Sequence, residues 1–514
     1  MRMLRAHFVL IAILASTGAL YLAGLGSHGM FMWDEAHYAV LGRALARGEG
    51  YVKPDGNPES LRPPVLPAAV ATTLIVAPAA TDVTIRSVTV VVALLCIAVI
   101  YGCVCLEAGV FAATAAALLF ATFPEIWRST SYLLTELPFM LFYTPAVFFF
   151  HRGMHVDSRN FVIAWPCFAL ALLTRYTAVL FGPTCLLLVA FPILTKNRAA
   201  LERMRSSAFL LGPAIAAVML TPLFGRAWIH FGDPLVGFKA AANQLPAYSV
   251  HAHMPLLYYL TLLPTMLGWL PTVALVVAVG EVLGRRDKLA ICCLIAAAVI
   301  VAWLSRYGWK EPRLISAALP FLAIVIALFL DSVSVEISRV VGERTGRNAP
   351  AVLAASVVIL CAAAFRFDPS YARASREILH SQTLGYPSFR TAMEAIANQT
   401  PNATVLMGPN CYQISWYSDR SCRPLPSLDL LASQNRSLSD VLADVDYVIA
   451  TSFERGQPTY IEAEVRRAER TDGDRVQTFR DRRYWTKVIP AEVLIRSDTS
   501  GAATSDDVER RESL

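Results

Sequence analysis

Carboxylates and cations at the ends of apolar stretches are the residues of this sequence best suited to chemistry. Asp34 and Glu35 follow the first apolar stretch, and Glu136 opens a later one. A carboxylate can accept the proton of an attacking hydroxyl group, and Arg or Lys can hold the charge that grows on a departing phosphate. Because a phosphate leaves well without an acid catalyst, one base and several cations suffice to move a sugar from a phosphate to a hydroxyl, unlike the two working carboxylates of a glycoside hydrolase. The candidate phosphate contacts read from the residues alone are Arg175, Lys310 and Arg313.

Each of these residues also has a structural explanation. Asp34 and Glu35 open a predicted helix, where acidic side chains accept backbone N–H groups and complement the helix dipole. Glu136 can reach the membrane interface from its helix end, and single cations at membrane boundaries often serve as anchors. An ionisable residue at a membrane boundary is nevertheless a fair functional candidate. The loop that ends in Arg62-Pro63-Pro64 and leads into a half-length apolar helix further indicates a folded outer cavity.

The composition assigns these residues to a polytopic α-helical membrane protein. Of the 514 residues, 55% are apolar and 16% charged, whereas soluble proteins are about 45–50% apolar. We predict a transmembrane catalytic domain over residues 1–365, in which residues 26–83 form the first outer loop with interfacial helices. A soluble α/β domain is expected over residues 366–499 and a disordered tail over residues 500–514. The net charge of +6 is modest and lies in short runs beside apolar stretches, which argues against a nucleic-acid partner.

About eleven apolar segments are candidate membrane spans, since a spanning helix needs about 20 mainly apolar residues. Short loops rich in Lys and Arg favour the cytoplasm, and five such loops assign Asp34, Glu136 and the C-terminal domain to the outer face. Because the loops at Arg5 and His151 are both assigned to the cytoplasm, the chain must cross the membrane an even number of times between them. This requires either that Val65–Ala80 not cross or that another weak candidate be dropped. We predict that Val65–Ala80 forms a re-entrant or interfacial helix. The candidate spans are 7–25, 84–105, 110–124, 134–150, 161–174, 177–195, 207–224, 256–282, 289–304, 313–331 and 350–365. The basic loops are Met1–Arg5, His151–Arg159, Lys196–Arg205, Arg285–Lys288 and Arg339–Arg347.

The polar C-terminal region predicts a small α/β domain. Short β-like runs at Thr404–Met407, Tyr447–Ala450 and Val488–Ile495 alternate with amphipathic helical stretches such as Tyr460–Arg470. Cys411 and Cys422 lie in this region and either form a disulfide, if the compartment is oxidising, or remain as thiols.

Few other features predict chemistry. Most of the ten cysteines lie in apolar runs, where a thiol packs as a small hydrophobe. His251-Ala252-His253 has no acidic neighbour and is more often incidental than metal-binding, so we predict no metal and no cofactor. Gly232-Asp233-Pro234 predicts a turn. The cysteines of the apolar runs are Cys96, Cys103, Cys105, Cys167, Cys185, Cys292, Cys293 and Cys361.

Taken in order, several short motifs resemble the landmarks of GT-C fold glycosyltransferases, most closely the protein O-mannosyltransferase-like and aminoarabinose transferase-like groups. The resemblance covers roughly residues 1–330 and rests on the order and spacing of the motifs. They are Trp33-Asp34-Glu35-Ala36-His37-Tyr38, Gly48-Glu49-Gly50-Tyr51, Arg62-Pro63-Pro64, Thr135-Glu136-Leu137-Pro138, Leu173-Thr174-Arg175-Tyr176 and Glu311-Pro312-Arg313-Leu314.

The resemblance implies roles for particular residues. Asp34 stands where the family has its catalytic acidic residue, and Glu136 where a second acidic residue lies at an outer helix end. Arg62 replaces a Lys that is more usual before the paired prolines, a position associated with the carrier phosphate. Because Arg is a planar fork and Lys a point charge, the contact at that position differs in detail. The family also implies inversion at the sugar carbon and no nucleotide-sugar donor.

We therefore expect a GT-C-like glycosyltransferase of the bacterial inner membrane with a periplasmic C-terminal domain. It is expected to move a sugar from a polyprenyl-phosphate carrier to a lipid, glycan or protein acceptor, with Asp34 as general base and Glu35 and Glu136 in support. One alternative is a transporter or flippase of lipid-linked sugars, which predicts charges near mid-membrane and often repeated halves; the sequence shows neither. The other is a non-catalytic assembly protein, which leaves the order of Asp34, Arg62 and Glu136 unexplained.

Overall fold

The computed structural model describes residues 2–26, 29–30, 32–249, 254–345, 367–383, 386–453 and 459–501. These residues form two compact units, described one at a time below. Unit 1 consists of Met1–Gly26 and Ser60–Gln382, and unit 2 consists of Ser27–Glu59 and Thr383–Leu514. The loop expected at residues 26–83 therefore contributes to both units. The predicted span at 350–365 and almost all of the predicted tail at 500–514 lie outside the described residues.

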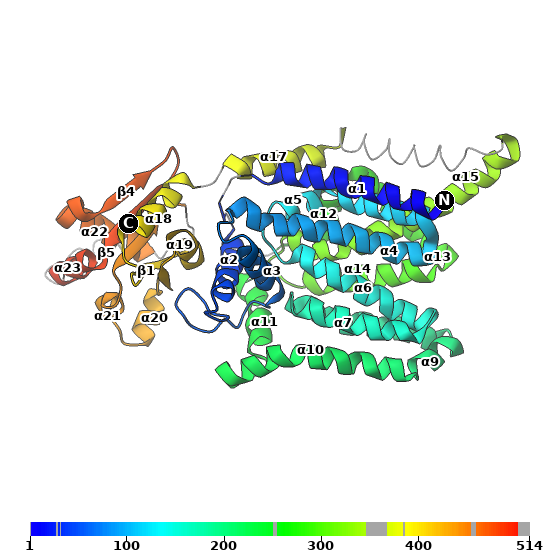
Figure 1. The fold of residues 1–514 in the computed structure, drawn as a ribbon, viewed down its shortest axis with the longest axis horizontal. Coiled ribbons are helices and arrows are strands. Elements are labelled where there is room, and N and C mark those ends of the chain that lie inside the picture. The colour runs from blue at the N-terminus through cyan, green and yellow to red at the C-terminus, as the bar shows by residue number, and fades with distance from the viewer. Residues whose placement is uncertain are drawn as a thin grey trace. The chain divides into compact units, whose positions relative to one another are not determined.

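Unit 1 is built of helices around a single apolar core (Figure 1). Its core is rich in Ala and Phe, and large apolar side chains such as Leu194, Leu210 and Ile229 also face outward, as expected where lipid is the solvent. The helices are α1 (Arg2–Gly24), α3 (Val65–Val76), α4 (Asp82–Thr122), α5 (Pro124–Thr130), α6 (Glu136–His155), η1 (Ser158–Asn160), α7 (Phe161–Leu172), η2 (Tyr176–Leu180), α8 (Phe181–Leu194), α9 (Arg198–Met204), α10 (Ser207–Phe231), α11 (Val236–Ser249), α12 (Tyr258–Leu267), α13 (Trp269–Arg285), α14 (Lys288–Ser305), η3 (Pro312–Ala318), α15 (Leu319–Thr345) and α17 (Pro369–Thr383).

Within the described residues, five helical segments are long and apolar enough to cross a membrane. The longest, α4, is broken at Gly109, whose φ of 84° and ψ of −175° leave the helical region, as predicted by separate candidates at 84–105 and 110–124. The predicted span 256–282 is wrong as a single helix, because Gly268 with φ 92° separates α12 from α13. The five segments are Asp82–Thr122, Tyr176–Leu194, Ser207–Phe231, Lys288–Ser305 and Pro312–Ile337.

The helix α3 is too short to cross a bilayer. Its 12 residues extend about 18 Å at 1.5 Å per residue, against about 30 Å for a hydrocarbon core. Its length thus agrees with the interfacial or re-entrant helix predicted for Val65–Ala80.

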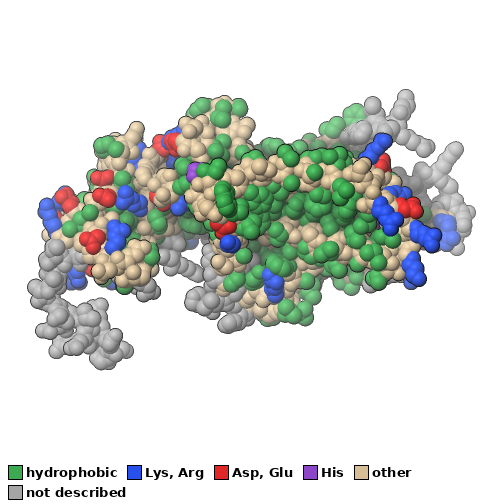
Figure 2. Space-filling view, turned by 90° about the horizontal axis from the view of Figure 1, so that it is seen from below, with side chains coloured by type: hydrophobic (Ala, Val, Ile, Leu, Met, Phe, Trp, Pro, Cys, Tyr) green, Lys and Arg blue, Asp and Glu red, His purple; other side chains and the backbone are tan. Residues whose placement is uncertain are grey.

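Three of the predicted basic loops meet at one end of unit 1. Arg152 near the end of α6 pairs with Glu107 at 2.7 Å, beside the break in α4. Arg203 of α9 donates to the Met154 carbonyl at 3.2 Å, and His155 interacts electrostatically with Lys288 at the start of α14. Figure 2 shows Lys and Arg gathered at this end, with hydrophobic side chains covering much of the helical surface.

Unit 2 is an α/β domain with a five-stranded sheet in the order β2-β1-β3-β5-β4. The pairs β1–β2 and β1–β3 are parallel, and β3–β5 and β4–β5 are antiparallel. The strands are β1 (Val405–Gly408), β2 (Ser421–Pro424), β3 (Tyr447–Thr451), β4 (Gln477–Arg480) and β5 (Trp485–Pro490). The helices are α2 (Trp33–Ala46), α18 (Pro387–Gln399), α19 (Cys411–Ser418), α20 (Leu428–Ser433), α21 (Leu438–Leu442), α22 (Thr459–Asp472), η4 (Gly473–Arg475) and α23 (Ala491–Gly501).

Both faces of this sheet are covered, because alternate residues of a strand point to opposite faces. In β1, Leu406 enters the core on the side of α18 and α19, whereas Met407 enters the core on the side of α22 and α23. In β3, Ile449 lies in the first of these cores and Val448 in the second. Unit 2 therefore has helices on each side of a central sheet.

The sequence predicted three of these elements closely and one only in part. The runs at Thr404–Met407 and Tyr447–Ala450 form β1 and β3, and Tyr460–Arg470 forms most of α22. The predicted strand Val488–Ile495 is wrong beyond Pro490, because α23 begins at Ala491.

Candidate active site

An ion pair between Glu136 and Arg175 is the centre of the candidate site in unit 1. Glu136 is the first residue of α6 and is 4% exposed, and Arg175 directly precedes η2. Arg175 Nη1 donates to Glu136 Oε1 at 2.9 Å. A carboxylate buried to this degree needs a charged partner, which Arg175 supplies. The second oxygen, Glu136 Oε2, is buried without a hydrogen-bond partner among the described residues, so it can accept a hydrogen bond from a ligand.

A buried tyrosine lies near this pair. Tyr259, the second residue of α12, is 1% exposed, and its hydroxyl lies within hydrogen-bonding reach of the Glu311 backbone. It interacts electrostatically with Arg175 and Glu311, and Glu311 Oε2 accepts from Arg313 Nε at 2.5 Å. Tyr259 therefore joins α12 to the segment that contains Glu311 and Arg313. Sequence reasoning missed Tyr259, because one tyrosine in an apolar helix carries no signal of its own.

The residues of this cluster lie at the starts of four helices. Glu136 begins α6, Arg175 precedes η2, Tyr259 lies in the first turn of α12, and Arg313 in that of η3. The first turn of a helix presents unpaired N–H groups and a partial positive charge, which favour anions. Together with the two guanidinium groups, these helix starts favour a negatively charged ligand such as a phosphate.

The segment that contains Arg62 lies beside the turn that contains Arg175. The Val65 N–H donates to the Leu173 carbonyl at 3.1 Å, and the Tyr176 hydroxyl donates to the Ser60 carbonyl at 3.2 Å. These two bonds flank Arg62 on both sides. The structure thus brings this predicted phosphate contact, which is partly exposed, into the neighbourhood of the ion pair.

Lys310 holds the loop before η3 through backbone contacts. It is 3% exposed, and its ammonium group donates to the carbonyls of Met254 and Tyr307 at 3.0 and 2.5 Å. Burial lowers the pKa of this amine below its usual value. Since an ammonium group has three N–H donors, one remains for a further partner. Lys310 therefore stabilises the loop before η3 with two of its N–H groups, and the third can contact a ligand.

A second buried carboxylate, Glu125, was not predicted. It lies in α5, is 3% exposed, and accepts from Arg128 Nη1, while Arg128 Nε pairs with Glu377 of α17 at 2.8 Å. Burial, opposed in part by Arg128 and reinforced by Glu136 and Glu377, raises the pKa of Glu125 to about 7. The signal in the sequence was an acidic residue directly after an apolar span.

Asp34 and Glu35 belong to unit 2, at the start of α2. Glu35 is fully buried, and its Oε2 accepts from the Met32 N–H at 2.9 Å in a capping box, so the capping explanation holds for this residue. Asp34 is partly exposed. Because Glu136 belongs to unit 1 and Asp34 to unit 2, a pocket shared by the two carboxylates stays a prediction.

One turn after Asp34, a buried pair fixes the first loop onto α2. His37 Nε2 lies 2.6 Å from Glu59 Oε2, and the two side chains are 1% and 2% exposed. The His37 ring also stacks on Tyr412 with centroids 3.7 Å apart. His37 belongs to the motif Trp33–Tyr38, but the sequence does not indicate its partner because Glu59 lies at the far end of the loop.

No group of three His, Cys, Asp or Glu side chains suited to hold a metal ion occurs in the part of the chain that the structure describes. His251 and His253 lie outside the described residues.

Comparison with solved structures decides the fold. The ArnT structure from Cupriavidus metallidurans in the apo state has a TM-score of 0.69 at 17% identity, covering 95% of this chain and 99% of that one. The ArnT structure bound to undecaprenyl phosphate has a TM-score of 0.70, also at 17% identity, with coverage of 94% and 98%. The chain has the GT-C fold. The archaeal oligosaccharyltransferase AglB from Archaeoglobus fulgidus, in complex with an inhibitory peptide and a dolichol-phosphate, shares it at a TM-score of 0.58 and 14% identity, with coverage of 86% and 69%.

A family comparison agrees with the GT-C fold. Residues 61–225 match the model of the dolichyl-phosphate-mannose-protein mannosyltransferase family. This match includes Arg62, Glu136 and Arg175 but neither Asp34 nor the segment around Arg313. No curated protein sequence matches the chain. The resemblance to GT-C glycosyltransferases drawn from the motifs is thereby confirmed, as is the expected fold class of a helical membrane protein with a small C-terminal α/β region.

Proposed function

We propose that this chain is a membrane glycosyltransferase that moves a sugar from a polyprenyl-phosphate carrier to a hydroxyl acceptor on the outer face of the membrane. The observation that carries the proposal is a GT-C fold over nearly the whole chain, combined with the buried Glu136–Arg175 pair and its unpartnered oxygen. The solved neighbours with undecaprenyl phosphate or dolichol-phosphate bound support a lipid phosphate as the carrier.

The proposed reaction is a single displacement at the sugar carbon. The acceptor oxygen forms a bond to the anomeric carbon while the bond from that carbon to the carrier phosphate oxygen breaks. The phosphate leaves with the bonding electron pair, and the acceptor proton passes to the carboxylate of Asp34. Attack opposite the leaving group inverts the configuration at the sugar carbon.

Arg175 and Arg313 are the proposed contacts of the departing phosphate. Of the five N–H donors of a guanidinium group, Arg175 places one on Glu136. The remaining donors, with the helix starts of α6, η2, α12 and η3, supply a positive environment for the charge that grows on the phosphate. Arg62 and Lys310 complete the proposed set, Arg62 from the neighbouring segment and Lys310 by holding the loop before η3.

Glu136 is proposed to support the reaction at the sugar. Its Oε1 orients Arg175, and its buried Oε2 can accept a hydrogen bond from a sugar or acceptor hydroxyl. Glu35 is proposed to act indirectly, by fixing the first turn of α2 and therefore the backbone of Asp34.

The test is release of carrier phosphate from defined donors. Purified full-length protein is incubated with a panel of polyprenyl-phosphate sugars and with cell-envelope lipids or glycans as acceptors, and free polyprenyl phosphate is measured. We expect release from at least one donor, and a loss of about 10²–10⁴-fold in Asp34→Asn, the range for removal of a general base.

A matched control and two contrary outcomes complete this experiment. Asp444→Asn changes an 82% exposed aspartate of unit 2 and is expected to keep full activity. Full activity in Asp34→Asn would exclude Asp34 as the base. Movement of the intact lipid-linked sugar across vesicles without release of carrier phosphate would show a transporter instead.

A further inference from the structure

The first loop of unit 2 contacts one short segment of the C-terminal region repeatedly. This segment, Cys411–Cys422, contains α19 and the first two residues of β2 and is closed by a disulfide between its two end residues. The Cα atoms of the two cysteines are 5.2 Å apart, within the usual range for a disulfide. We call residues 411–422 the disulfide segment. The pairing of these cysteines, left open by the sequence, is thus present in the structure.

The contacts begin just before α2. The Met30 N–H donates to the Tyr417 hydroxyl at 2.6 Å, and Gln413 Nε2 donates to the Met30 carbonyl at 2.7 Å. In the first turn of α2, Trp33 lies edge-on to Tyr412 at a centroid distance of 5.1 Å. The backbone on the N-terminal side of Asp34 is therefore fixed by α19.

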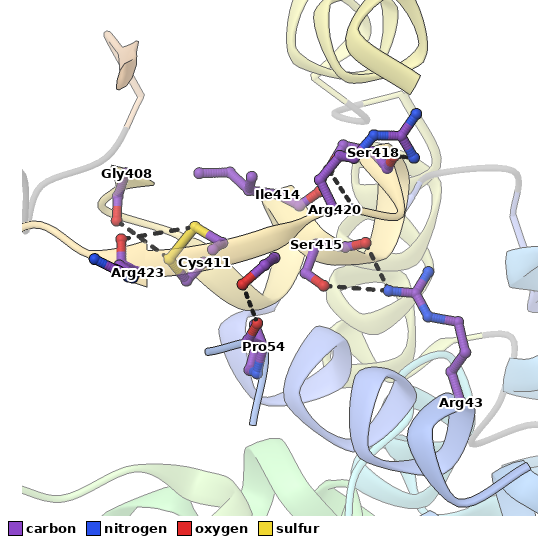
Figure 3. Close-up of a disulfide and its surroundings, with 11 residues drawn as sticks. Arg43, Pro54, Gly408, Cys411, Ile414, Ser415, Ser418, Arg420 and Arg423 are labelled. Carbon is purple, nitrogen blue, oxygen red and sulfur yellow. Dashed lines mark hydrogen bonds between the residues drawn. A yellow bond between two sulfur atoms is a disulfide. The ribbon is translucent and has the colours of Figure 1, made fainter. Parts of the chain in front are cut away.

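The contacts at the other end of α2 are made by arginines. Arg43 donates to the Ser415 carbonyl at 2.6 Å (Figure 3). It also donates to the Trp416 carbonyl at 2.9 Å, and its guanidinium lies over the Trp416 ring. These carbonyls belong to the last turn of α19, the negative end of the helix. Arg47 forms two bonds to the carboxylate of Asp419 at 2.8 and 2.9 Å.

Charge supports the same arrangement. Burial, opposed by neighbouring Asp419, lowers the pKa of Arg43 to about 10, so this guanidinium is still protonated at pH 7. The hydrogen bonds from Arg47 hold the pKa of Asp419 below its usual value. The loop after α2 adds a further contact, because the Pro54 carbonyl accepts from the Ser421 hydroxyl at 3.0 Å (Figure 3).

The helix α2 needs this support. It has 14 residues, and isolated helices of this length are marginal in water. Nine of its residues are buried, so packing supplies the stability that its length does not. Asp34 lies nine positions before Arg43, about 13 Å along the helix axis. A tilt of about 10° at Arg43 would shift Asp34 by about 2 Å, and shifts of about 1 Å can cost 10²-fold in rate.

We propose that the disulfide segment positions α2 for transfer, with Arg43 as its main positioning residue. This proposal rests on the proposed function, since a shift of α2 lowers the rate only if Asp34 is the general base. The C-terminal region thereby affects the rate of the chemical step indirectly, because its contacts within unit 2 hold the helix that contains Asp34.

The test combines hydrogen exchange with kinetics on the full-length protein. Exchange of residues 33–46 and of strands β3 and β5 is measured for the wild type, Arg43→Gln, Arg43→Lys and the double variant Cys411→Ser/Cys422→Ser. We expect faster exchange in α2 for Arg43→Gln and the double serine variant, with β3 and β5 unchanged. The turnover number is expected to fall about 10- to 100-fold while the KM for the donor changes less than about threefold. Arg43→Lys should recover part of the rate, because it keeps the charge but loses the fork.

Controls separate positioning from simple loss of folding. Arg466→Gln is the same substitution at an exposed position of α22. This variant should match the wild type in both hydrogen exchange and kinetics. If Arg43→Gln unfolds unit 2, seen as fast exchange in β3 and β5, mild reduction of the disulfide in the wild type gives a second perturbation with the same expected result.

The outcomes that overturn the proposal are distinct from failure of the proposed function. An active wild type whose α2 exchange and turnover are unchanged in Arg43→Gln and after loss of the disulfide would exclude only the positioning role. A loss confined to KM would also exclude it. A wild type that releases no carrier phosphate from any donor would overturn the proposed function, and the catalytic role of the segment with it.

Discussion

At the scale of single residues, the Glu136–Arg175 pair stands out because, among the described residues, one oxygen of the carboxylate has a hydrogen-bond partner and the other has none. The bonded oxygen fixes a cation at a helix start. The unbonded oxygen is buried, which costs free energy unless a ligand completes it. Such incomplete pairing is expected where a substrate supplies the missing partner.

Removing the charge of Glu136 tests this pair. Glu136→Gln keeps the shape of the side chain but leaves Arg175 without its anion, so we expect the turnover number to fall about 10- to 100-fold. The measurement is carrier-phosphate release at saturating donor. Glu281→Gln, in the Glu281–Arg285 pair of α13, serves as control and is expected to retain the wild-type rate. Equal losses in the two variants would show a general effect of lost ion pairs.

Glu125 gives a prediction for pH. Its folded-state pKa of about 7 lies above the usual carboxyl value near 4.3, so the folded state binds this proton more tightly than the unfolded state. The stabilisation is fully present below pH 4.3 and is lost as the pH rises through 7. We expect the midpoint of thermal unfolding to fall between pH 5 and pH 8 more steeply in the wild type than in Glu125→Gln, measured in detergent. Parallel curves for the two proteins would contradict this.

Little of this side-chain geometry could be read from the sequence. The sequence predicted that Glu136, Arg175 and Arg313 matter, because charges at the ends of apolar runs are costly. It could not pair Glu136 with Arg175, 39 residues away, or His37 with Glu59 across the first loop. Those partners depend on how the chain folds back, which periodicity does not reveal.

At the scale of elements, glycines decide where long apolar runs break. Gly109 adopts φ 84° and ψ −175°, a conformation nearly restricted to glycine. The sequence predicted this break only as the gap between the candidate spans 84–105 and 110–124. It missed the break at Gly268, where the run continues without a charge on both sides.

Two alanine substitutions in α4 test the break. Gly109→Ala should lower the free energy of unfolding by about 1–2 kcal/mol, because the side chain disfavours this backbone conformation. Gly102→Ala is the matched control, since Gly102 is helical and nothing lies within 4 Å of the added methyl group. It should be neutral or stabilising by up to about 1 kcal/mol. Equal unfolding midpoints in detergent would contradict a requirement for glycine at position 109.

Strands were predictable where a short apolar run stood between polar segments. The runs of β1 and β3 are continuously apolar because both faces of these strands lie in apolar cores, a pattern typical of strands buried on both faces. The run Val488–Ile495 was extended too far because its apolar residues continue past Pro490 into α23. Strands β2 and β4 were missed because their residues are mostly polar and partly exposed.

At the scale of the whole molecule, the orientation predicted from loop charges concerns the basic end of unit 1. Arg152, Arg203 and Lys288 gather at one end. The positive-inside rule predicts that this end faces the cytoplasm and that the opposite end, with Glu136 and Arg175, faces outward.

Labelling from outside tests that orientation. Single cysteines at Asn57, Asp444 and Arg198, all exposed positions, are treated in intact spheroplasts with a membrane-impermeant maleimide. We expect labelling of Asn57→Cys and Asp444→Cys, and labelling of Arg198→Cys only after the membrane is opened. The wild type sets the background from native thiols. Labelling of all three positions before lysis would contradict the proposed orientation.

The division of unit 2 into two distant stretches of chain has a consequence for synthesis. Ser27–Glu59 leaves the ribosome more than 300 residues before Thr383–Leu514. At about 5–20 residues per second, α2 waits roughly 15 seconds to a minute for the strands and helices that bury it. A ribosome that stalls or terminates early therefore leaves a chain in which α2 lacks the part of unit 2 that buries it, and we expect such a truncated chain to have no transferase activity.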